Sequence, residues 1–322
     1  MTTPAATVSV TPGAARSRAN LTVSLIIPTK NRPEELTQTV RSIAALVSHP
    51  EELVIIDQSQ ASAEAAVKDI VSDCRGMRLV YLLEPQLPGL VAARLRSLEV
   101  ASGDILFFVD DDNTLEADCV ARLRERFLAR PDIMGICAVD TSGLTIPWWL
   151  VWARRAYMLG PWNDIRSLIN KRYRGLRDPQ PTRLFSGGYM SFRRGVFREF
   201  QFEDRLWGHR WCSSIDFSYR VSSKHLLVID PLVRMFHRNP YGTYEPAQWV
   251  RIRVAGAFFF FQRNVRKNPV NWACFLWLLT AIGVRSVSRG METQQLGRTV
   301  GAFIGECRRG LTFLRQPFAS PY

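Results

Sequence analysis

The sequence predicts an α/β fold with a mostly parallel central sheet, followed by a helical region at its C-terminal end. Two observations predict the sheet. Short apolar runs alternate with stretches of helical periodicity from residue 21 onward, as in strand–helix–strand units. The run at 105–109 is apolar throughout, as expected of a strand buried on both faces. A third observation predicts the separate helical region, because aromatic and basic residues become dense after Pro240.

The predicted elements follow one another with short connections. Aliphatic residues form the first strand at 23–27, and this strand ends at a polar loop that contains Pro28 and Pro33. Apolar residues then recur at helical spacing through 34–47. The same alternation predicts further strands at 53–56, 79–83 and 105–109, and further helices at 63–74, 91–100 and 115–129.

Acidic side chains follow two of these strands where each one ends. Asp57 comes directly after the second strand, and Asp110, Asp111 and Asp112 come directly after the fourth. Because ligands of open α/β sheets bind at the carboxyl ends of the strands, both groups are expected at one edge. Three adjacent carboxylates repel one another, and a Mg²⁺ or Mn²⁺ ion shared with phosphate oxygens would neutralise them. The alternative is a solvated acidic turn that caps the next helix.

Charge is unevenly distributed along the 322 residues, which carry a net charge of +13. Residues 1–150 contain 14 Lys and Arg against 19 Asp and Glu, whereas residues 151–322 contain 28 against 10. A basic half suits nucleic acid, anionic lipid or an anionic substrate. The six cysteines show no paired spacing, so we expect free thiols in a reducing compartment. Residues 1–20 lack an apolar core and are predicted to be a disordered tail without a signal peptide.

Several motifs resemble one known family. They are SLIIPTKNR at 24–32, VIIDQS at 54–59, GDILFFVDDD at 103–112, FSGGYMSFRR at 185–194, DFSYR at 216–220 and PLVRMFH at 231–237. In this order they resemble the motifs of family 2 glycosyltransferases, which have the GT-A fold, a Rossmann-like arrangement. The resemblance covers about residues 21–239, which are therefore expected to form a GT-A domain.

The resemblance implies roles for individual residues. Donor binding falls to Pro28, Thr29, Asp57, Asp110, Asp111, Gly187 and Gly188. Asp112 and His237 would hold the divalent metal, Mg²⁺ or Mn²⁺. The family's base position is occupied by a serine here, so we expect Asp216, the one acid retained in that motif, to be the catalytic base. Such a cation stabilises the charge that develops on a departing nucleoside diphosphate. Glycines allow the backbone to approach a ligand closely.

Two positions depart from the family pattern. Leu95 stands where the family usually has Asn, and Ser213 and Ser214 stand where it has Glu and Asp, the Asp being the usual general base. A serine cannot accept the acceptor's proton at neutral pH without an activating base of its own. The nearby acid–base candidates left open by the sequence are Glu203, Asp204, His209 and Asp216.

Residues 240–322 are predicted to form a helical, basic and aromatic region that associates with a membrane. Apolar stretches at 249–265 and 272–284 are flanked by Arg and Lys. Neither reaches the roughly 20 residues that span a bilayer, so we expect helices that lie in the membrane interface. The alternative is that these helices pack on the catalytic domain or on a second subunit.

These features predict an inverting glycosyltransferase. The expected partners are a UDP-, GDP- or dTDP-linked sugar, a hydroxyl acceptor that is lipid-linked or part of a surface glycan, and an anionic membrane. We expect a cytoplasmic protein, peripheral on the inner face of the cell membrane, and no nucleic-acid partner. One alternative is a catalytically silent scaffold in glycan assembly. Another is a haloacid-dehalogenase-type phosphatase, because Asp110, Asp112 and Thr114 match its local motif.

Overall fold

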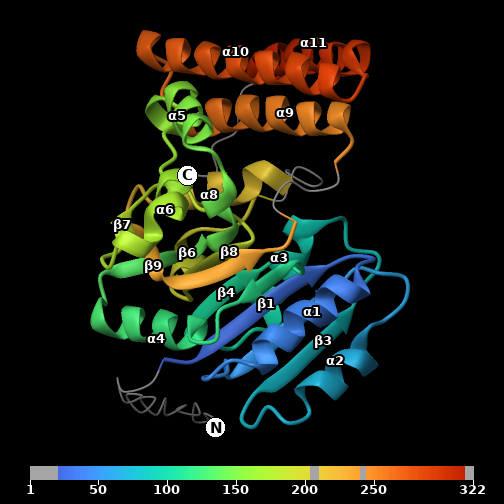
Figure 1. The fold of residues 1–322 in the computed structure, drawn as a ribbon, viewed down its shortest axis with the longest axis vertical. Coiled ribbons are helices and arrows are strands. Elements are labelled where there is room, and N and C mark those ends of the chain that lie inside the picture. The colour runs from blue at the N-terminus through green and yellow to red at the C-terminus, as the bar shows by residue number, and fades with distance from the viewer. Residues whose placement is uncertain (1–20, 204–209, 240–243, 316–322) are drawn as a thin grey trace, which may run out of the picture.

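The computed structural model describes residues 21–203, 210–239 and 244–315. A single nine-stranded sheet forms the centre, in the order β3-β2-β1-β4-β8-β6-β9-β5, with β7 paired to β9. Helices cover the sheet, and three long helices form a separate layer beyond one of its sides (Figure 1). The predicted disordered tail, 1–20, lies outside the described residues.

The strands divide the sheet into a parallel part and a mixed part. They are β1 (Val23–Thr29), β2 (Glu52–Asp57), β3 (Arg78–Leu83), β4 (Ile105–Val109), β5 (Asn113–Leu115), β6 (Ile133–Asp140), β7 (Gln180–Pro181), β8 (Tyr189–Arg193) and β9 (Leu226–His237). The first four pair only in parallel with one another. β8 is antiparallel to both β4 and β6, β6 is parallel to β9, and β5 and β7 are antiparallel to β9.

The apolar runs found in the sequence form the buried part of the sheet. All seven residues of β1 and all five of β4 are buried, because helices and neighbouring segments cover both faces. The helices of this half are α1 (Pro33–Ala44), α2 (Glu64–Val71), α3 (Leu90–Val100) and α4 (Cys119–Ala129). α1 and α2 lie together on one face, and α3 contacts β1 and β2. The predicted alternation of strands and helices is therefore confirmed through α3.

The segment after the acidic run differs from the prediction. Residues 115–129 were expected to be one helix, but Asn113–Leu115 form β5, and the helix begins at Cys119. β5 pairs antiparallel with the end of β9, so that Asn113 faces His237 across the pair. Pairing with a distant strand decides the conformation here, and the local sequence does not contain that information.

Shorter helices connect the mixed part of the sheet to the C-terminal layer. They are α5 (Trp148–Tyr157), α6 (Arg166–Arg172), α7 (Val196–Glu199) and α8 (Arg210–Val221). α8 contacts both α3 of the sheet domain and α9 of the layer above. These contacts hold Ser213 and Ser214 of α8 close to the sheet edge. The segment that contains Gly187 and Gly188 is held there as well.

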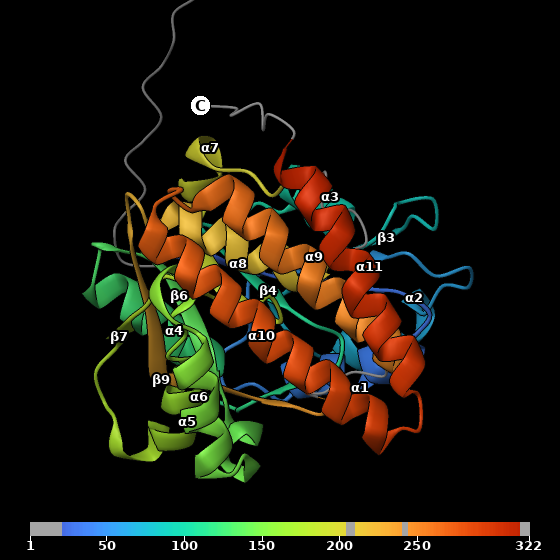
Figure 2. The same cartoon turned by 90° about the horizontal axis from the view of Figure 1, so that it is seen from above.

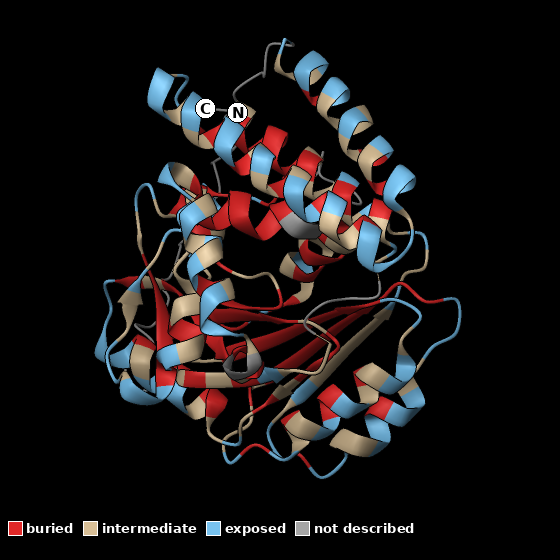
Figure 3. Cartoon of the chain, turned by 45° about the horizontal axis from the view of Figure 1, so that its top comes forward, coloured by how far each residue is buried: buried red, intermediate tan, exposed pale blue. Residues whose placement is uncertain are grey.

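The C-terminal layer consists of α9 (Pro246–Asn264), α10 (Pro269–Glu292) and α11 (Leu296–Leu314). α10 and α11 lie across α9 (Figure 2), and burial alternates along them from inward to outward positions (Figure 3). The expected length of the second helix was wrong, because α10 has 24 residues and is long and apolar enough to cross a membrane by length and composition. Charged side chains such as Arg285 end the apolar stretch in the sequence but do not end the helix.

Candidate active site

The acidic cluster lies at the carboxyl end of β4, beside the end of β1. The hydroxyl of Thr29, the last residue of β1, donates a hydrogen bond of 2.7 Å to Asp111. Asp111 and Asp112 are nearly buried, whereas the side chain of Asp110 is about one third exposed. Two of the predicted donor-binding residues and the predicted metal ligand thus meet at one edge of the sheet.

Arg32 is a counter-ion of this cluster that the sequence analysis did not single out. Its guanidinium donates hydrogen bonds to Asp111 at 2.7 Å and to Asp112 at 2.9 Å. Burial still outweighs this attraction at Asp111 and raises the pKa of its carboxyl group to about 7. The neighbouring charges of Asp110 and Asp112 act in the same direction. Arg32 alone therefore does not hold the pKa of Asp111 in its usual range.

His237 reaches the cluster through the pairing of β5 with β9. Its Nε2 atom lies 3.1 Å from Oδ1 of Asp112, and this buried oxygen accepts no well-aligned hydrogen bond. Burial opposes ionisation of Asp112, but the contacts with His237 and Arg32 outweigh it and lower the pKa of the carboxyl group. Burial likewise opposes protonation of His237, yet the neighbouring acids raise its pKa.

The residues fit a divalent cation that is completed by a substrate. No group of three or more His, Cys, Asp and Glu side chains within the described part of the chain could enclose a metal. Mg²⁺ and similar ions, however, are commonly held by one or two carboxylates together with substrate phosphates. The under-bonded Oδ1 of Asp112, beside the imidazole of His237, suits such an open site.

Arg238 fixes the backbone of the acidic turn. It donates hydrogen bonds to the carbonyl oxygens of Asn113 at 2.9 Å and Asp111 at 3.0 Å, and to that of Glu35 at 2.8 Å. Its own backbone N–H bonds to the carbonyl of Asp112 at 3.0 Å. Arg238, the residue directly after β9 and after the predicted His237, thus holds the shape of the turn.

Gly187 and Gly188 lie where side chains would not fit. A Cβ atom on Gly188 would be 2.6 Å from Oδ2 of Asp110. A Cβ atom on Gly187 would be 2.7 Å from the guanidinium of Arg94 and 3.1 Å from the hydroxyl of Ser214. Gly188 therefore brings backbone against Asp110, and Gly187 brings it against Arg94 and Ser214. The close approach of these glycines to a donor sugar or an acceptor stays a prediction.

Asp57 is placed at the same edge, at the end of β2, but its oxygens already have partners. The Tyr81 hydroxyl and the backbone N–H of Ser59 both donate hydrogen bonds to its carboxylate. Burial, together with this hydrogen bond, raises the pKa of Tyr81 to about 12, so the hydroxyl keeps its proton. Tyr81 was missed because it stands within an apolar strand. Contact between Asp57 and a nucleoside stays a prediction.

α8 and Arg94 of α3 lie next to the segment that contains Gly187. Arg94 is almost fully buried and donates to the carbonyl of Gly187 at 2.8 Å and to the hydroxyl of Ser213 at 3.3 Å. Its Nη2 atom lies 3.9 Å from Oδ1 of Asp110. An arginine therefore lies between the donor acids and the pair of serines. The next residue is Leu95, where the sequence departs from the family pattern, and its side chain is only partly buried.

Asp216 is not brought to the acidic cluster. It is completely buried, and one carboxylate oxygen accepts two hydrogen bonds from Arg220 at 2.8 and 3.0 Å. The other accepts one from Asn264 at 2.8 Å and lies 3.4 Å from Nε of Arg263. These contacts join α8 to α9 and favour a structural role. The predicted role of general base stays a prediction that no contact of Asp216 supports.

Among the described residues, no other acid–base candidate takes the place of Asp216 as general base. Glu203 is buried and forms an ion pair with Arg263. Asp204 and His209 lie outside the residues that the structure describes. Ser214 itself is nearly buried, next to Gly187. α8 begins at Arg210, so Ser213 lies inside the helix and does not cap it.

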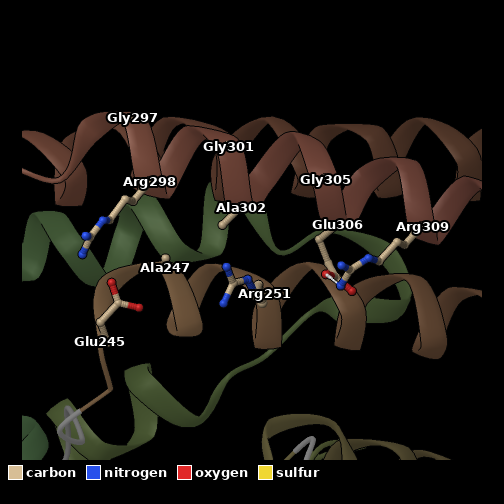
Figure 4. Close-up of a pocket in the computed structure, with 10 residues that line it drawn as sticks. All are labelled: Glu245, Ala247, Arg251, Gly297, Arg298, Gly301, Ala302, Gly305, Glu306 and Arg309. Atoms are coloured by element: carbon tan, nitrogen blue, oxygen red, sulfur yellow. Dashed lines mark hydrogen bonds and ion pairs between the residues drawn. The ribbon is translucent and has the colours of Figure 1, made fainter.

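A cavity of about 500 Å³ between α9 and α11 lies apart from these residues (Figure 4). Glycines of α11 and charged side chains of both helices surround it: Gly297, Gly301, Gly305, Arg251, Arg298, Arg309, Glu245 and Glu306. None of the predicted site residues lines it. The chemistry therefore belongs to the sheet edge and not to this cavity.

Comparison with known proteins identifies the family. A family model described as Glycosyl transferase family 2 matches residues 24–200, which is more than half of the chain. The chain belongs to this family. The matched region contains the acidic cluster, both glycines and Arg94, and it ends before α8. The family assignment removes the phosphatase alternative.

Curated relatives match part of their length. A glucosyl-dolichyl phosphate glucuronosyltransferase of Haloferax volcanii is 28% identical over 180 residues, which are 55% of this chain and 54% of the relative. A glucosyl-3-phosphoglycerate synthase of Mycobacterium tuberculosis is 31% identical over 99 residues, 30% of each chain. The matches thus span about half or less of these relatives.

Solved structures show the same fold over most of the chain. The mannosyltransferase PcManGT from Pyrobaculum calidifontis, in complex with GDP-Man and Mn²⁺, has a TM-score of 0.58 at 17% identity and covers 92% of this chain and 79% of its own. S. aureus TarS 1-349 in complex with UDP-GlcNAc has a TM-score of 0.54 at 14% identity, covering 89% and 81%. The predicted GT-A fold with C-terminal helices is confirmed.

Proposed function

We propose that this chain is an inverting, metal-dependent glycosyltransferase that moves a sugar from a nucleotide donor to a hydroxyl acceptor. The observation that carries the proposal is the convergence of Thr29, three acids and His237 at one sheet edge, where the pKa of Asp111 is raised. Membership of the family supports the same reaction. Domain boundaries at 21–239 and 240–322 are part of the proposal.

Each side of the site has a distinct task. Asp112 and His237 would hold the cation, which supplies positive charge beside the donor's diphosphate. Asp110, Asp111 and Thr29 would position the nucleotide, because they lie at the strand ends where ligands of such sheets bind. The backbone of Gly187 and Gly188 would contact the donor sugar or the acceptor, since no side chain separates it from the cluster.

The proposed donor is a nucleotide-linked sugar, and the proposal assigns neither the base of the nucleotide nor the sugar. The titles of two structural neighbours name GDP-Man and UDP-GlcNAc, and one of them names Mn²⁺. These titles support UDP-, GDP- or dTDP-linked donors and a divalent ion. The name of the Haloferax volcanii relative, a glucosyl-dolichyl phosphate glucuronosyltransferase, supports a lipid-linked acceptor. The basic C-terminal helices support a place on the inner face of the cell membrane.

Hydrolysis of a panel of sugar nucleotides, with and without Mn²⁺, tests the reaction without knowledge of the acceptor. We expect metal-dependent release of nucleoside diphosphate from one or a few donors, and loss of this release in Asp112→Asn. Hydrolysis that proceeds equally with a chelator present would contradict metal dependence. If no donor is turned over, the second candidate function, a catalytically silent scaffold, is favoured.

A catalytically silent scaffold is the second candidate, and α8 favours it. Ser213 and Ser214 supply no carboxylate, and Asp216 is enclosed by Arg220, Asn264 and Arg263. A silent protein would still bind a nucleotide sugar at the acidic cluster. Binding of a donor that raises the melting temperature, with no turnover of that donor by the full chain, would establish this second function.

A further inference from the structure

Three tryptophans of α5 and several apolar residues of α10 are exposed. On α5, Trp148, Trp149 and Trp152 are 47%, 70% and 60% exposed. Their spacing places them on one face of the helix, since residues at i, i+1 and i+4 span about 100°. Three neighbouring exposed tryptophans on a ten-residue helix exceed the single exposed apolar residues of an ordinary surface.

α10 extends this surface. Most of its exposed positions are uncharged: Val270, Ala273, Leu276, Trp277, Thr280, Val284, Val287 and Met291. The exposed charged residues Arg285 and Glu292 form an ion pair with each other near its C-terminal end. Val284 and Met291 are 62% and 66% exposed. The inward side packs on the layer below, where the ring of Phe275 stacks 4.3 Å from that of Phe261. α10 is therefore apolar on both its packed side and its open side.

Contacts at the junction make α5 and α10 one surface. The indole N–H of Trp277 donates a hydrogen bond of 2.8 Å to the carbonyl of Ala156. The Trp277 ring also stacks on that of Tyr157, with the ring centres 5.2 Å apart. The two helices lie side by side when the layer is viewed from above (Figure 2). Tryptophans of α5 and aliphatic residues of α10 are thus held in a fixed relation.

We propose that this α5–α10 surface seats the protein on an anionic bilayer, with the α5 tryptophans at the level of the lipid headgroups. The inference deepens the proposed membrane association and rests on it. Tryptophan is enriched at membrane interfaces because its ring is apolar and its N–H is polar. The exposed residues Arg154 on α5 and Arg266 just before α10 adjoin the two helices and complement anionic headgroups. Arg285 is also exposed and is paired with Glu292.

α10 lies along the bilayer and does not cross it, although its length of about 36 Å would suffice. Crossing would carry α9 and α11 with it, because α10 packs along both of them. α9 has Arg251 and Arg263, and α11 has Arg308 and Arg309, and these charges are costly within hydrocarbon. A packed inner side and an open apolar outer side suit a helix that lies in the interface.

A second copy of the chain fits this surface less well. A two-fold dimer places the same patch against itself. The basic residues that border the patch would then face one another, and like charges across an interface disfavour binding. Anionic headgroups neutralise the same residues. The charge pattern therefore selects the bilayer over self-association.

The test is co-sedimentation of the full chain with vesicles of phosphatidylglycerol and phosphatidylcholine, against vesicles of phosphatidylcholine alone. We expect the wild type to bind the anionic vesicles, more weakly as salt rises. The variant Trp148→Ala/Trp149→Ala/Trp152→Ala should bind these vesicles at least about tenfold more weakly than the wild type, because each ring contributes apolar area at the interface. The control Val47→Ala/Leu83→Ala/Leu128→Ala removes exposed apolar residues of the sheet domain and should bind like the wild type.

Four results would overturn the inference. The tryptophan variant could bind like the wild type, or the control could lose binding equally. Extraction only by detergent, with no effect of salt, would indicate a spanning helix. A wild-type dimer that becomes a monomer in the tryptophan variant would assign the surface to a second copy.

Donor hydrolysis separates failure of this inference from failure of the proposed reaction. The tryptophan variant retains every residue of the acidic cluster, so metal-dependent hydrolysis in solution should equal that of the wild type. If the wild-type protein hydrolyses a donor but binds no vesicles, the inference of a membrane-binding surface is wrong and the proposed enzymatic reaction still holds.

Discussion

Asp112 at the end of β4 and Asp216 on α8 are both buried carboxylates of the candidate site, but their surroundings differ. Asp112 lies beside two further acids and faces one arginine and one histidine, and one of its oxygens accepts no hydrogen bond. Asp216 lies between two arginines and an asparagine. Asp112 thus shares its positive neighbours with two other acids, whereas Asp216 has two arginines close to it. The comparison is consistent with the proposed cation at the sheet edge and with a role of Asp216 in joining α8 to α9.

Asp112→Asn should give the largest effect, because it removes a charged group from the predicted cation site. We expect metal-dependent turnover to fall by about 100- to 1000-fold, the usual cost of losing one electrostatic contact to a transition state. The fold should persist, since the substitution relieves repulsion among neighbouring carboxylates. Steady-state kinetics and circular dichroism measure the two expectations. Asp132→Asn, in an exposed acid paired with Arg130, is the control and should leave turnover unchanged.

Asp216→Asn tests the other side of the comparison. It leaves Arg220 and Arg263 with less counter-charge in a buried setting, and breaking a buried pair costs about 3–5 kcal/mol. We expect a lower free energy of unfolding in urea, with kcat of the remaining folded protein changed less than threefold. An unchanged unfolding midpoint together with a tenfold loss of kcat and of one limb of the pH profile would instead identify Asp216 as the base.

Arg32→Gln tests how the charge beside Asp112 affects metal binding. Arg32 occupies the acids that a metal would neutralise, so its removal should allow Mn²⁺ alone to bind about tenfold more tightly. Electron paramagnetic resonance of free and bound Mn²⁺ measures this affinity without any turnover. Arg96→Gln, which breaks ion pairs with Glu84 and Glu99, is the matched control. Weaker binding of Mn²⁺ in Arg32→Gln would show that the arginine assists the metal.

Ser214→Asp tests whether the site lacks a base. It restores a carboxylate at the position where the family has one, next to Gly187 and Arg94. We expect transfer to be retained or to rise, because a positioned base speeds such reactions by about 100- to 10,000-fold when it is otherwise missing. Ser223→Asp at the exposed end of α8 controls for added charge. Abolished transfer in Ser214→Asp alone would show that the position has another role.

The sequence predicted those parts of the fold that depend on local pattern. Buried strands such as β1 and β4 form unbroken apolar runs, and the acids that follow them must lie at one edge of a parallel sheet. The antiparallel pairing of β5 with β9 was missed because it joins residues more than 120 positions apart. Residues 240–322 were predicted to be helical, but the bounds of α11 were not, because Gly297, Gly301 and Gly305 weaken the helical signal there.

The site was predictable where a residue's neighbours in sequence determine its position. Gly188 lies against the acidic cluster, within a motif that the sequence singled out. Arg32 and Arg94 were not predicted as site residues, since their partners lie on other strands and helices. The environment of Asp216 could not be predicted either. Asn264 and Arg263 come from α9, far along the chain, and nothing around the DFSYR motif indicates that they enclose its first residue.

The central claim is that the acidic cluster binds a nucleotide diphosphate through a divalent cation. Calorimetric titration of the wild-type chain with UDP, GDP and dTDP, each with and without Mn²⁺, tests it most directly. We predict that at least one nucleotide binds with Mn²⁺ and that its affinity falls at least tenfold when the metal is removed. Equal affinity with and without Mn²⁺ would contradict the claim.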